Sequence, residues 1–388
     1  MAEVSSQIVK GLTEFSWNLY RLAAQNGDNF LISPHSVCSA LMLTCLGANG
    51  NTADQIFNTL GMRGMTFEGY HTAYSIEYLN ILLNDALKKD GSDGVTLKVA
   101  NKMFAGSEMK VLEKYVQDAG KLYASGTQTM DFAAKPDESR QLINKWVEDQ
   151  TNDKIKDLLK EGSITSDTRL VLANAVYFKG KWSKPFKPEK TVSNTFCLSS
   201  ASRTEVKMMR EKYDMQYTRN EELKFAAVSV PYQNNVVSMV IVRPDDVDGL
   251  SEIERSFNQD NLVSLLIDLR QSMKAKVDLG LPKFAFKKAS DLTRILPKLG
   301  VTDLFDESKV DLSAMTDSSG IAINDVIHEA FIDVNEEGTE AAAATAMISR
   351  MMMLPTEEVE FICDRPFLFM LVQNMSDHIL FIGRFAKP

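Results

Sequence analysis

Residues 169–178, RLVLANAVYF, constrain the fold most strongly because they are apolar at nearly every position. A strand with one face in water alternates apolar and polar residues, whereas a strand covered on both faces is apolar throughout. We therefore predict that this segment is a strand inside a sheet, with both of its faces buried.

Helical patterns dominate the first third of the chain. Residues 36–46, SVCSALMLTCL, form an apolar run that begins just after Ser33-Pro34 and stops at Gly47, which are start and stop signals for a buried helix. Further helices are predicted at residues 8–24, 51–60 and 137–159.

Strand patterns dominate later in the chain. Two apolar runs flank a Gln-Asn-Asn turn within residues 224–242, and two more flank residues 374–377 near the end. Other strands are predicted within residues 275–286, 320–334 and 357–361. Because helices and strands are mixed and no repeat or low-complexity linker separates them, we predict an α+β fold in a single domain over residues 1–388.

Composition excludes several classes of protein. The net charge of -9 and the pI of about 5.2 argue against a nucleic-acid binder, which would show a basic patch. No apolar run reaches the roughly 20 residues that span a bilayer, so no membrane partner is expected, and the start of the chain lacks the pattern of a signal peptide. The four cysteines form no CxxC pair, and we interpret Cys38 and Cys45 as buried free thiols.

The chain offers little reactive chemistry. It has four histidines and no nucleophile elbow, phosphate-binding glycine loop or HExxH motif, so we expect neither an enzyme nor a metal or cofactor site. Ser33 and Ser36 lie at a helix start, where hydroxyls are more often caps than nucleophiles. His328 lies in an apolar strand pattern and is interpreted as an interior hydrogen-bonded group.

Residues 336–355, EEGTEAAAATAMISRMMMLP, are the unusual feature. They connect two predicted strands, and connections of about 20 residues are uncommon in compact domains unless they are functional or disordered. On its own, the composition of this segment favours a short alanine-rich helix or a mobile linker over a functional loop.

Seven motifs in order make the chain resemble the serpin family over nearly its whole length. They are NFLISPHSVCSALMLTCLGANGNTADQI (29–56), INKWVEDQTNDKIKDLL (143–159), LVLANAVYFKGKWSKPF (170–186), VPYQNNVVSMVIVRP (230–244), LPKFAF (281–286), HEAFIDVNEEGTEAAAAT (328–345) and DRPFLFMLVQNMSDHILFIGRFAKP (364–388). The resemblance implies three β-sheets, about nine helices and an exposed reactive-centre loop at about residues 336–356.

The resemblance also implies a mechanism. A target protease cleaves the loop, the loop inserts into the main sheet as an extra strand, and the acyl-enzyme is trapped. The hinge of the loop would be Glu336, Glu337, Gly338, Thr339, Glu340, Ala341, Ala342, Ala343, Ala344 and Thr345. If insertion begins after Gly338, alternate residues from Thr339 point inward and are small and uncharged, which a strand entering a packed core requires.

Other positions carry over by motif. Ser33, Ser36, Asn174 and His328 resemble the family's polar cluster beneath the main sheet, where its central strands must part. Trp182 resembles the tryptophan at which the loop first inserts. Glu336 and Lys283 match a family ion pair at the base of the loop, and we predict that pair here.

Counting fourteen residues from Gly338, as the family pattern implies, places the scissile bond at Met352–Met353. A methionine there suits elastase-like or chymotrypsin-like serine proteases, which have apolar specificity pockets. Arg350–Met351 is the alternative, because Arg350 is the only basic residue of the loop and suits a trypsin-like protease.

Three questions stay open at this point. There are two alternative functions. The chain could be a non-inhibitory serpin that acts as a carrier or chaperone, or it could inhibit a cysteine protease. The location is either extracellular, by family prior, or cytoplasmic, as the resemblance to the leaderless ovalbumin-type branch allows. Asn374 is a glycosylation acceptor only if the chain passes through the secretory route. The protein is expected to act as a monomer.

Overall fold

The structure, a computed structural model, describes residues 2–62, 68–69, 71, 74–75, 94–123, 125–339 and 358–388. The α-helices in this part of the chain are α1 (Ala2–Ala23), α2 (Pro34–Cys45), α3 (Gly50–Thr59), α5 (Glu113–Tyr123), α6 (Pro136–Gln150), α7 (Leu250–Ser256), α8 (Gln259–Gln271) and α9 (Leu296–Leu299). The strands are β1 (Phe30–Ile32), β2 (Val95–Gly106), β3 (Thr127–Met130), β4 (Leu170–Lys181), β5 (Val192–Ser199), β6 (Ser202–Asn220), β7 (Phe225–Pro231), β8 (Val237–Pro244), β9 (Lys274–Pro282), β10 (Phe284–Asp291), β11 (Asp325–Val334), β12 (Gly338–Thr339), β13 (Glu358–Ile362), β14 (Phe367–Gln373) and β15 (His378–Phe385).

The predicted buried helix is α2, and every one of its residues is buried. Ser33 is its N-cap, because the Ser33 side chain accepts a hydrogen bond from the Ser36 backbone N–H, and Pro34 follows in the first turn. The helix start predicted from Ser33-Pro34 is therefore confirmed.

The end predicted for α6 is wrong. The pattern predicted helix to residue 159, but the helix ends at Gln150. Asn152 and Asp153 adopt φ values of 52° and 61°, which an α-helix cannot continue through. The side chain of Asn144 instead bonds both the N–H and the carbonyl of Leu159, and so holds the later apolar residues against the helix.

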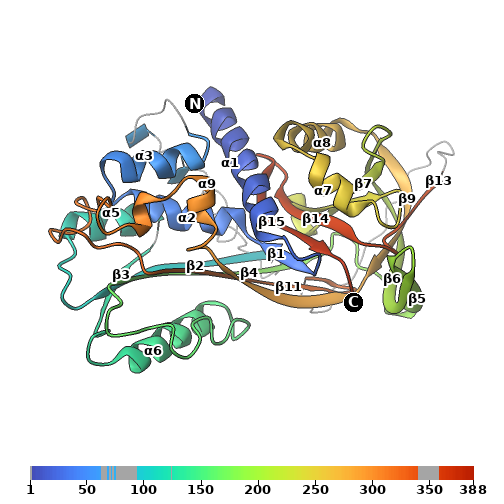
Figure 1. Cartoon of the computed structure of the whole chain (residues 1–388). Helices are drawn as coiled ribbons and strands as arrows, with labels where there is room; N and C mark the ends of the chain where they lie inside the picture. Colours follow the sequence, from blue (N-terminus) through green and yellow to red (C-terminus); the bar gives the residue numbers. More distant parts are fainter. Residues whose placement is uncertain are drawn as a thin grey trace.

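The strand predicted at residues 169–178 is β4, in the middle of the smaller sheet. The strand order there is β10-β11-β4-β2-β3, with β12 also paired to β4. Figure 1 shows α6 on one face of this sheet and α2 on the other. Leu170 and Leu172 join the apolar core beside α1 and α2, whereas Val171 and Ala173 join the core under α6. Both faces of β4 are thus buried, as its apolar sequence predicts.

The larger sheet has the order β1-β15-β14-β8-β7-β6-β9-β13, with β5 paired to β6. The resemblance implied three sheets, and hydrogen bonds join the described strands into two. The reason is β6, whose 19 residues pair with β5 at one end, with β7 at the other and with β9 between. The α+β class is confirmed.

The turn between the last two strands lies at residues 374–377, as predicted. The region predicted as one weak strand at residues 275–286 is divided between β9 and β10 at Lys283. Cys38 and Cys45 are buried free thiols, also as predicted. Among the described helices, none is long and apolar enough to cross a membrane.

The four histidines of the chain, His35, His71, His328 and His378, are at most 3% exposed. Burial disfavours the charged imidazolium and lowers their pKa values, to about 4 for His71 and His378, to about 3 for His328, and well below the ordinary value for His35. The folded protein therefore holds these four side chains neutral at pH values where the unfolded chain would protonate them.

We predict that acidification from pH 7.5 to 5.5 destabilises the protein. A folded pKa below the unfolded value of about 6.5 gives stability that is complete above that value and is lost as pH falls towards the folded pKa. The loss in unfolding free energy over this range is roughly 1.4 kcal/mol per histidine. Thermal unfolding followed by circular dichroism should show a clear drop in Tm between pH 7.5 and 5.5 and little change between 8.5 and 7.5. An unchanged or higher Tm at pH 5.5 would contradict this.

Candidate functional site

The reactive-centre loop expected from the sequence is described only at its two ends. Residues 336–339 and 358–362 are described, whereas residues 340–357 are not. The expected scissile positions Met352 and Met353, the alternatives Arg350 and Met351, and the hinge residues from Glu340 to Thr345 lie outside the described residues.

The described hinge is a tight turn between β11 and β12. Asn335 and Gly338 exchange backbone hydrogen bonds of 2.8 and 3.2 Å across Glu336 and Glu337. After this turn, Gly338 and Thr339 pair antiparallel with Lys181 and Gly180 of β4. The chain thus reverses at the hinge and begins a strand alongside β4.

Gly338 is required at this turn for two reasons. Its φ is 147°, a conformation that other residues rarely adopt, and a Cβ atom there would lie 2.0 Å from the carbonyl oxygen of Gly180. The sequence indicated the need for backbone freedom. The close approach to a glycine of β4 could not be read from the sequence.

Trp182 lies directly beside the hinge. Its indole N–H donates to the carbonyl of Asn335 at 2.9 Å, and its backbone N–H donates to the carbonyl of Glu337 at 2.9 Å. Its ring stacks on Tyr232 with centroids 4.4 Å apart. The structure therefore brings Trp182 against the hinge residues, where the family motif places it.

The predicted ion pair at the base of the loop is present. Lys283 Nζ lies 2.9 Å from Glu336 Oε2, and the Glu336 side chain is mostly buried. Burial alone would raise the pKa of Glu336, but hydrogen bonds to the carboxylate, the one from Lys283 foremost, together with the charge of Lys283 outweigh burial and lower this pKa. The carboxylate is therefore ionised and holds the turn to the start of β10.

The predicted polar cluster is also assembled, at the centre of the smaller sheet above the N-terminus of α2. Asn174 and His328 are register partners in β4 and β11, and Asn174 Oδ1 bonds the Nδ1 of His328. Asn174 Nδ2 donates to the Oγ of Ser36 at 2.7 Å and to its carbonyl at 3.0 Å. His328 Nε2 accepts from the backbone N–H of Ser33 at 3.1 Å. All four side chains are fully buried.

These contacts fix the protonation state of His328. Because Nε2 accepts a hydrogen bond, the proton of the neutral ring lies on Nδ1, facing Asn174. A second proton would face the Ser33 N–H, and burial already lowers the pKa of His328 to about 3. His328 is thus an interior hydrogen-bonding group, as its sequence context indicated.

Sequence reasoning missed one member of the cluster. Asn101 of β2 is the register partner of Asn174, and its Oδ1 accepts a hydrogen bond from Asn174 Nδ2. The sequence gives no distinct signal for Asn101, because β2 also contains the polar residues Thr96, Lys98 and Lys102. The row Asn101, Asn174 and His328 therefore crosses β2, β4 and β11.

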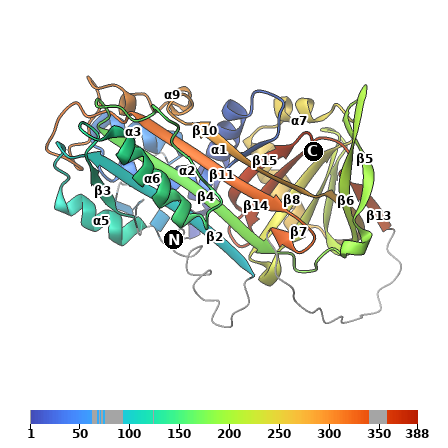
Figure 2. The same ribbon diagram turned by 90° about the horizontal axis from the view of Figure 1, so that it is seen from below.

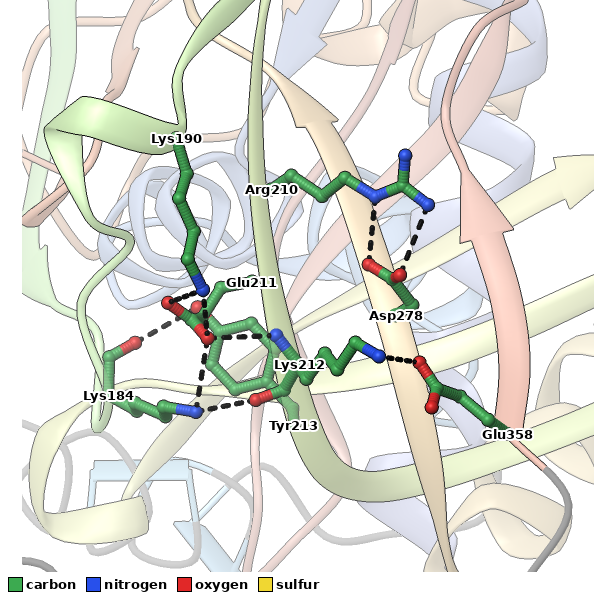
Figure 3. Close-up of polar contacts among 8 residues, drawn as sticks. All are labelled: Lys184, Lys190, Arg210, Glu211, Lys212, Tyr213, Asp278 and Glu358. Atoms are coloured by element: carbon green, nitrogen blue, oxygen red, sulfur yellow. Dashed lines mark hydrogen bonds and ion pairs between the residues drawn. The ribbon is translucent and has the colours of Figure 1, made fainter.

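The other described end of the loop, β13, is an edge strand held by charges. It pairs only with β9 among the described strands. Arg210 of β6 reaches across β9 and bonds both Asp278 at 2.9 Å and Glu360 at 2.7 Å. Lys212 forms an ion pair with Glu358, which Figure 3 shows beside the Arg210–Asp278 pair. The strand that follows the loop is thus tied to β6, two strands away.

Asn374, the possible glycosylation acceptor, lies in the turn before β15. Its side-chain amide donates to the carbonyl of Asn235 at 2.9 Å. A glycan on this nitrogen would have to replace one of its hydrogens, while the other could keep the bond. The turn is half-buried at Asn374 and exposed at Met375.

Comparison with known proteins decides the family. The profile of the family described as "Serpin (serine protease inhibitor)" matches residues 10–388. The chain belongs to the serpin family.

Among curated relatives, this serpin is 37% identical over 388 residues to leukocyte elastase inhibitor of Homo sapiens, with 98% of this chain and all of that protein covered. It is 36% identical over 384 residues to Serpin B3 of Homo sapiens, covering 97% and 98% of the two chains. Among solved structures, uncleaved ovalbumin matches with a TM-score of 0.86 and 27% identity, over 98% of this serpin and 100% of that chain.

We predict that Asn174→Ala strongly destabilises the protein. The substitution removes the partners of Ser36 and His328 inside the fully buried cluster, and buried polar groups left without a partner cost about 1–3 kcal/mol each. The loss of unfolding free energy should therefore be roughly 3 kcal/mol, measured by urea unfolding at pH 7.5. Asn194→Ala, at an exposed position of β5, is the control. A loss below about 0.5 kcal/mol for Asn174→Ala would show that the cluster contributes little to stability.

Proposed function

We propose that this serpin inhibits serine proteases as a suicide substrate, whose loop is cut and then inserts between β4 and β11. The observation that carries the proposal is the hinge turn: Gly338 and Thr339 already pair antiparallel with β4. An inserted strand would continue this pairing along the edge of β4. Insertion would therefore extend an existing ladder instead of starting a new one.

The arrangement of β4 and β11 supports this path. The two strands pair in parallel from Val171 to Tyr177 of β4, and β12 follows on the same side at Gly180 and Lys181. Parting the parallel pair would free one edge of each strand for a new antiparallel partner. Antiparallel pairs are slightly more stable per residue than parallel pairs, which favours insertion.

The sequence of the loop suits such a strand. From Thr339 onward, the positions that would point into the core are Thr339, Ala341, Ala343, Thr345 and Met347, none of them charged. The single glutamate of this stretch, Glu340, would point outward. Four of these five inward residues are small and none is charged, which argues against the alternative of a non-inhibitory carrier or chaperone, because no charged side chain would obstruct insertion.

We further propose Met352–Met353 as the bond that is cut, with an elastase-like or chymotrypsin-like protease as the target. The count from Gly338 and the similarity to leukocyte elastase inhibitor support this choice. Arg350–Met351 is the second candidate, for a trypsin-like protease. Inhibition of a cysteine protease is the remaining alternative, and the assay below distinguishes it.

Incubation with chymotrypsin, pancreatic elastase, trypsin and papain should give an SDS-stable complex with elastase or chymotrypsin. Mass spectrometry of the released C-terminal fragment should find Met353 as its first residue, whereas a fragment beginning at Met351 would support Arg350. Arg350→Ala is the matched control, because it should leave the elastase complex unchanged. Cleavage by every protease without any stable complex would refute the inhibitory function.

Methionine oxidation offers an independent prediction. Peroxide converts methionine to a polar sulfoxide, which an apolar specificity pocket binds poorly, so inhibition of elastase should fall at least about tenfold. The Met352→Leu variant should keep its inhibition after the same treatment, although other exposed methionines such as Met273 still oxidise. Equal sensitivity of both proteins would mean that Met352 is not the specificity residue.

A further inference from the structure

Residues 182–190, which connect β4 to β5, hold the hinge by backbone hydrogen bonds. The Trp182 N–H donates to the carbonyl of Glu337 at 2.9 Å, and the Phe186 N–H donates to the carbonyl of Glu336 at 2.8 Å. Both residues of the hinge turn therefore depend on this connection for their carbonyl partners. The connection contains little regular structure of its own beyond one short turn of 3₁₀-helix, Pro188–Lys190.

A short segment of β6 in turn holds the connection. Glu211 is 5% exposed, and its carboxylate lies 3.2 Å from Lys190 Nζ and 3.5 Å from Lys184 Nζ. It also accepts the backbone N–H of Lys212 at 3.1 Å. Figure 3 shows both lysines converging on this single carboxylate.

Tyr213 adds further contacts from the same strand. Its hydroxyl donates to the carbonyl of Lys184 at 3.0 Å, and its ring packs edge-on against Phe186 with centroids 5.5 Å apart. The ammonium of Lys184 also lies over the Tyr213 ring, 5.3 Å from its centroid. Residues 211–213 thus contact the connection on both sides of Phe186.

We propose that Glu211 is a positioning residue for loop insertion: through Lys184 and Lys190 it holds residues 182–190 in the place where their N–H groups order the hinge turn. The proposal rests on the proposed suicide-substrate function. The Glu211 side chain is 6% exposed, whereas the side chains of Lys184 and Lys190 are 50% and 44% exposed. The carboxylate resists displacement from its two ammonium partners, because losing both would leave it desolvated and unpaired. The ion pairs of Glu211 with Lys184 and Lys190 therefore hold the connection more rigidly than ion pairs on the surface would.

The hold of Glu211 on the connection affects inhibition because loop insertion competes with hydrolysis of the acyl bond. After cleavage, the loop must insert before the acyl bond to the protease is hydrolysed. A hinge turn held in register with Gly180 and Lys181 lets pairing continue at once, whereas a loosened turn must be ordered again first. Loss of Glu211 should therefore slow insertion and release more inhibitor as cleaved product, without changing how the protease first attacks the loop.

The test compares wild type with Glu211→Gln, which keeps the shape and removes the charge, and with Tyr213→Phe. Arg219→Met is the matched control. Arg219 lies on the same strand as Glu211 and forms ion pairs with Asp245 and Glu221, but it does not contact the connection. One measurement is hydrogen exchange at the amides of Trp182 and Phe186. The other is the stoichiometry of inhibition of pancreatic elastase, separated from the association rate.

We expect faster exchange at both amides in Glu211→Gln and Tyr213→Phe, but not in Arg219→Met. Insertion should slow by roughly fivefold, the effect of about one lost hydrogen bond, and the stoichiometry should rise while the association rate, corrected for stoichiometry, stays constant. The double variant Glu211→Gln with Lys190→Met should be no worse than Glu211→Gln alone.

Two results would overturn the proposal. Unchanged exchange would mean that Glu211 does not hold the connection, and faster exchange with unchanged stoichiometry would mean that the connection does not govern insertion. If wild type itself forms no stable complex with any protease, the suicide-substrate function fails, and the exchange data still decide whether Glu211 orders the hinge.

Discussion

The parallel pairing between β4 and β11 is the interaction on which the rest of the structure depends. It runs over seven residue pairs, from Val171 with Asp325 to Tyr177 with Phe331. Beyond the Tyr177 end of this ladder, the chain turns at Glu336 and Glu337, and β12 pairs with the edge of β4. At the middle pair of this ladder, Asn174 and His328 contact the N-terminus of α2 through the buried cluster. In the middle of the sheet, β4 and β11 thus lie side by side and are closed against each other (Figure 2), whereas at one end β12 already pairs with β4.

Two sets of polar contacts stabilise this closed arrangement, one within the sheet and one at the hinge. The cluster around Asn174 and His328 joins the facing strands by uncharged hydrogen bonds, which can be exchanged without leaving a buried charge. The hinge is held by charged groups instead. Glu336 pairs directly with Lys283, and Glu211 pairs with Lys190 of the connection that bonds the hinge. The proposed function requires β4 and β11 to part while the hinge keeps its register, and this division of uncharged and charged contacts suits that requirement.

The sequence predicts local features better than distant contacts. The apolar run at residues 169–178 predicts a strand buried on both faces, and Ser33-Pro34 predicts the start of α2, because each depends on neighbours in the chain. The end of α6 was mispredicted, because Asn152 and Asp153 leave the helix while the apolar pattern continues. The Lys283–Glu336 pair was found only through the family resemblance. Glu211 gave no signal, because a glutamate in the alternating sequence of β6 looks like an exposed strand residue.

The central claim is that the cut loop becomes a strand between β4 and β11. Thermal unfolding of the protein before and after cleavage within residues 350–353 tests it most directly. On the order of ten new backbone hydrogen bonds, at about 1 kcal/mol each, should raise the Tm of the cleaved protein by roughly 12 °C. A cleaved protein that unfolds at the same or a lower temperature than the intact one would contradict the account.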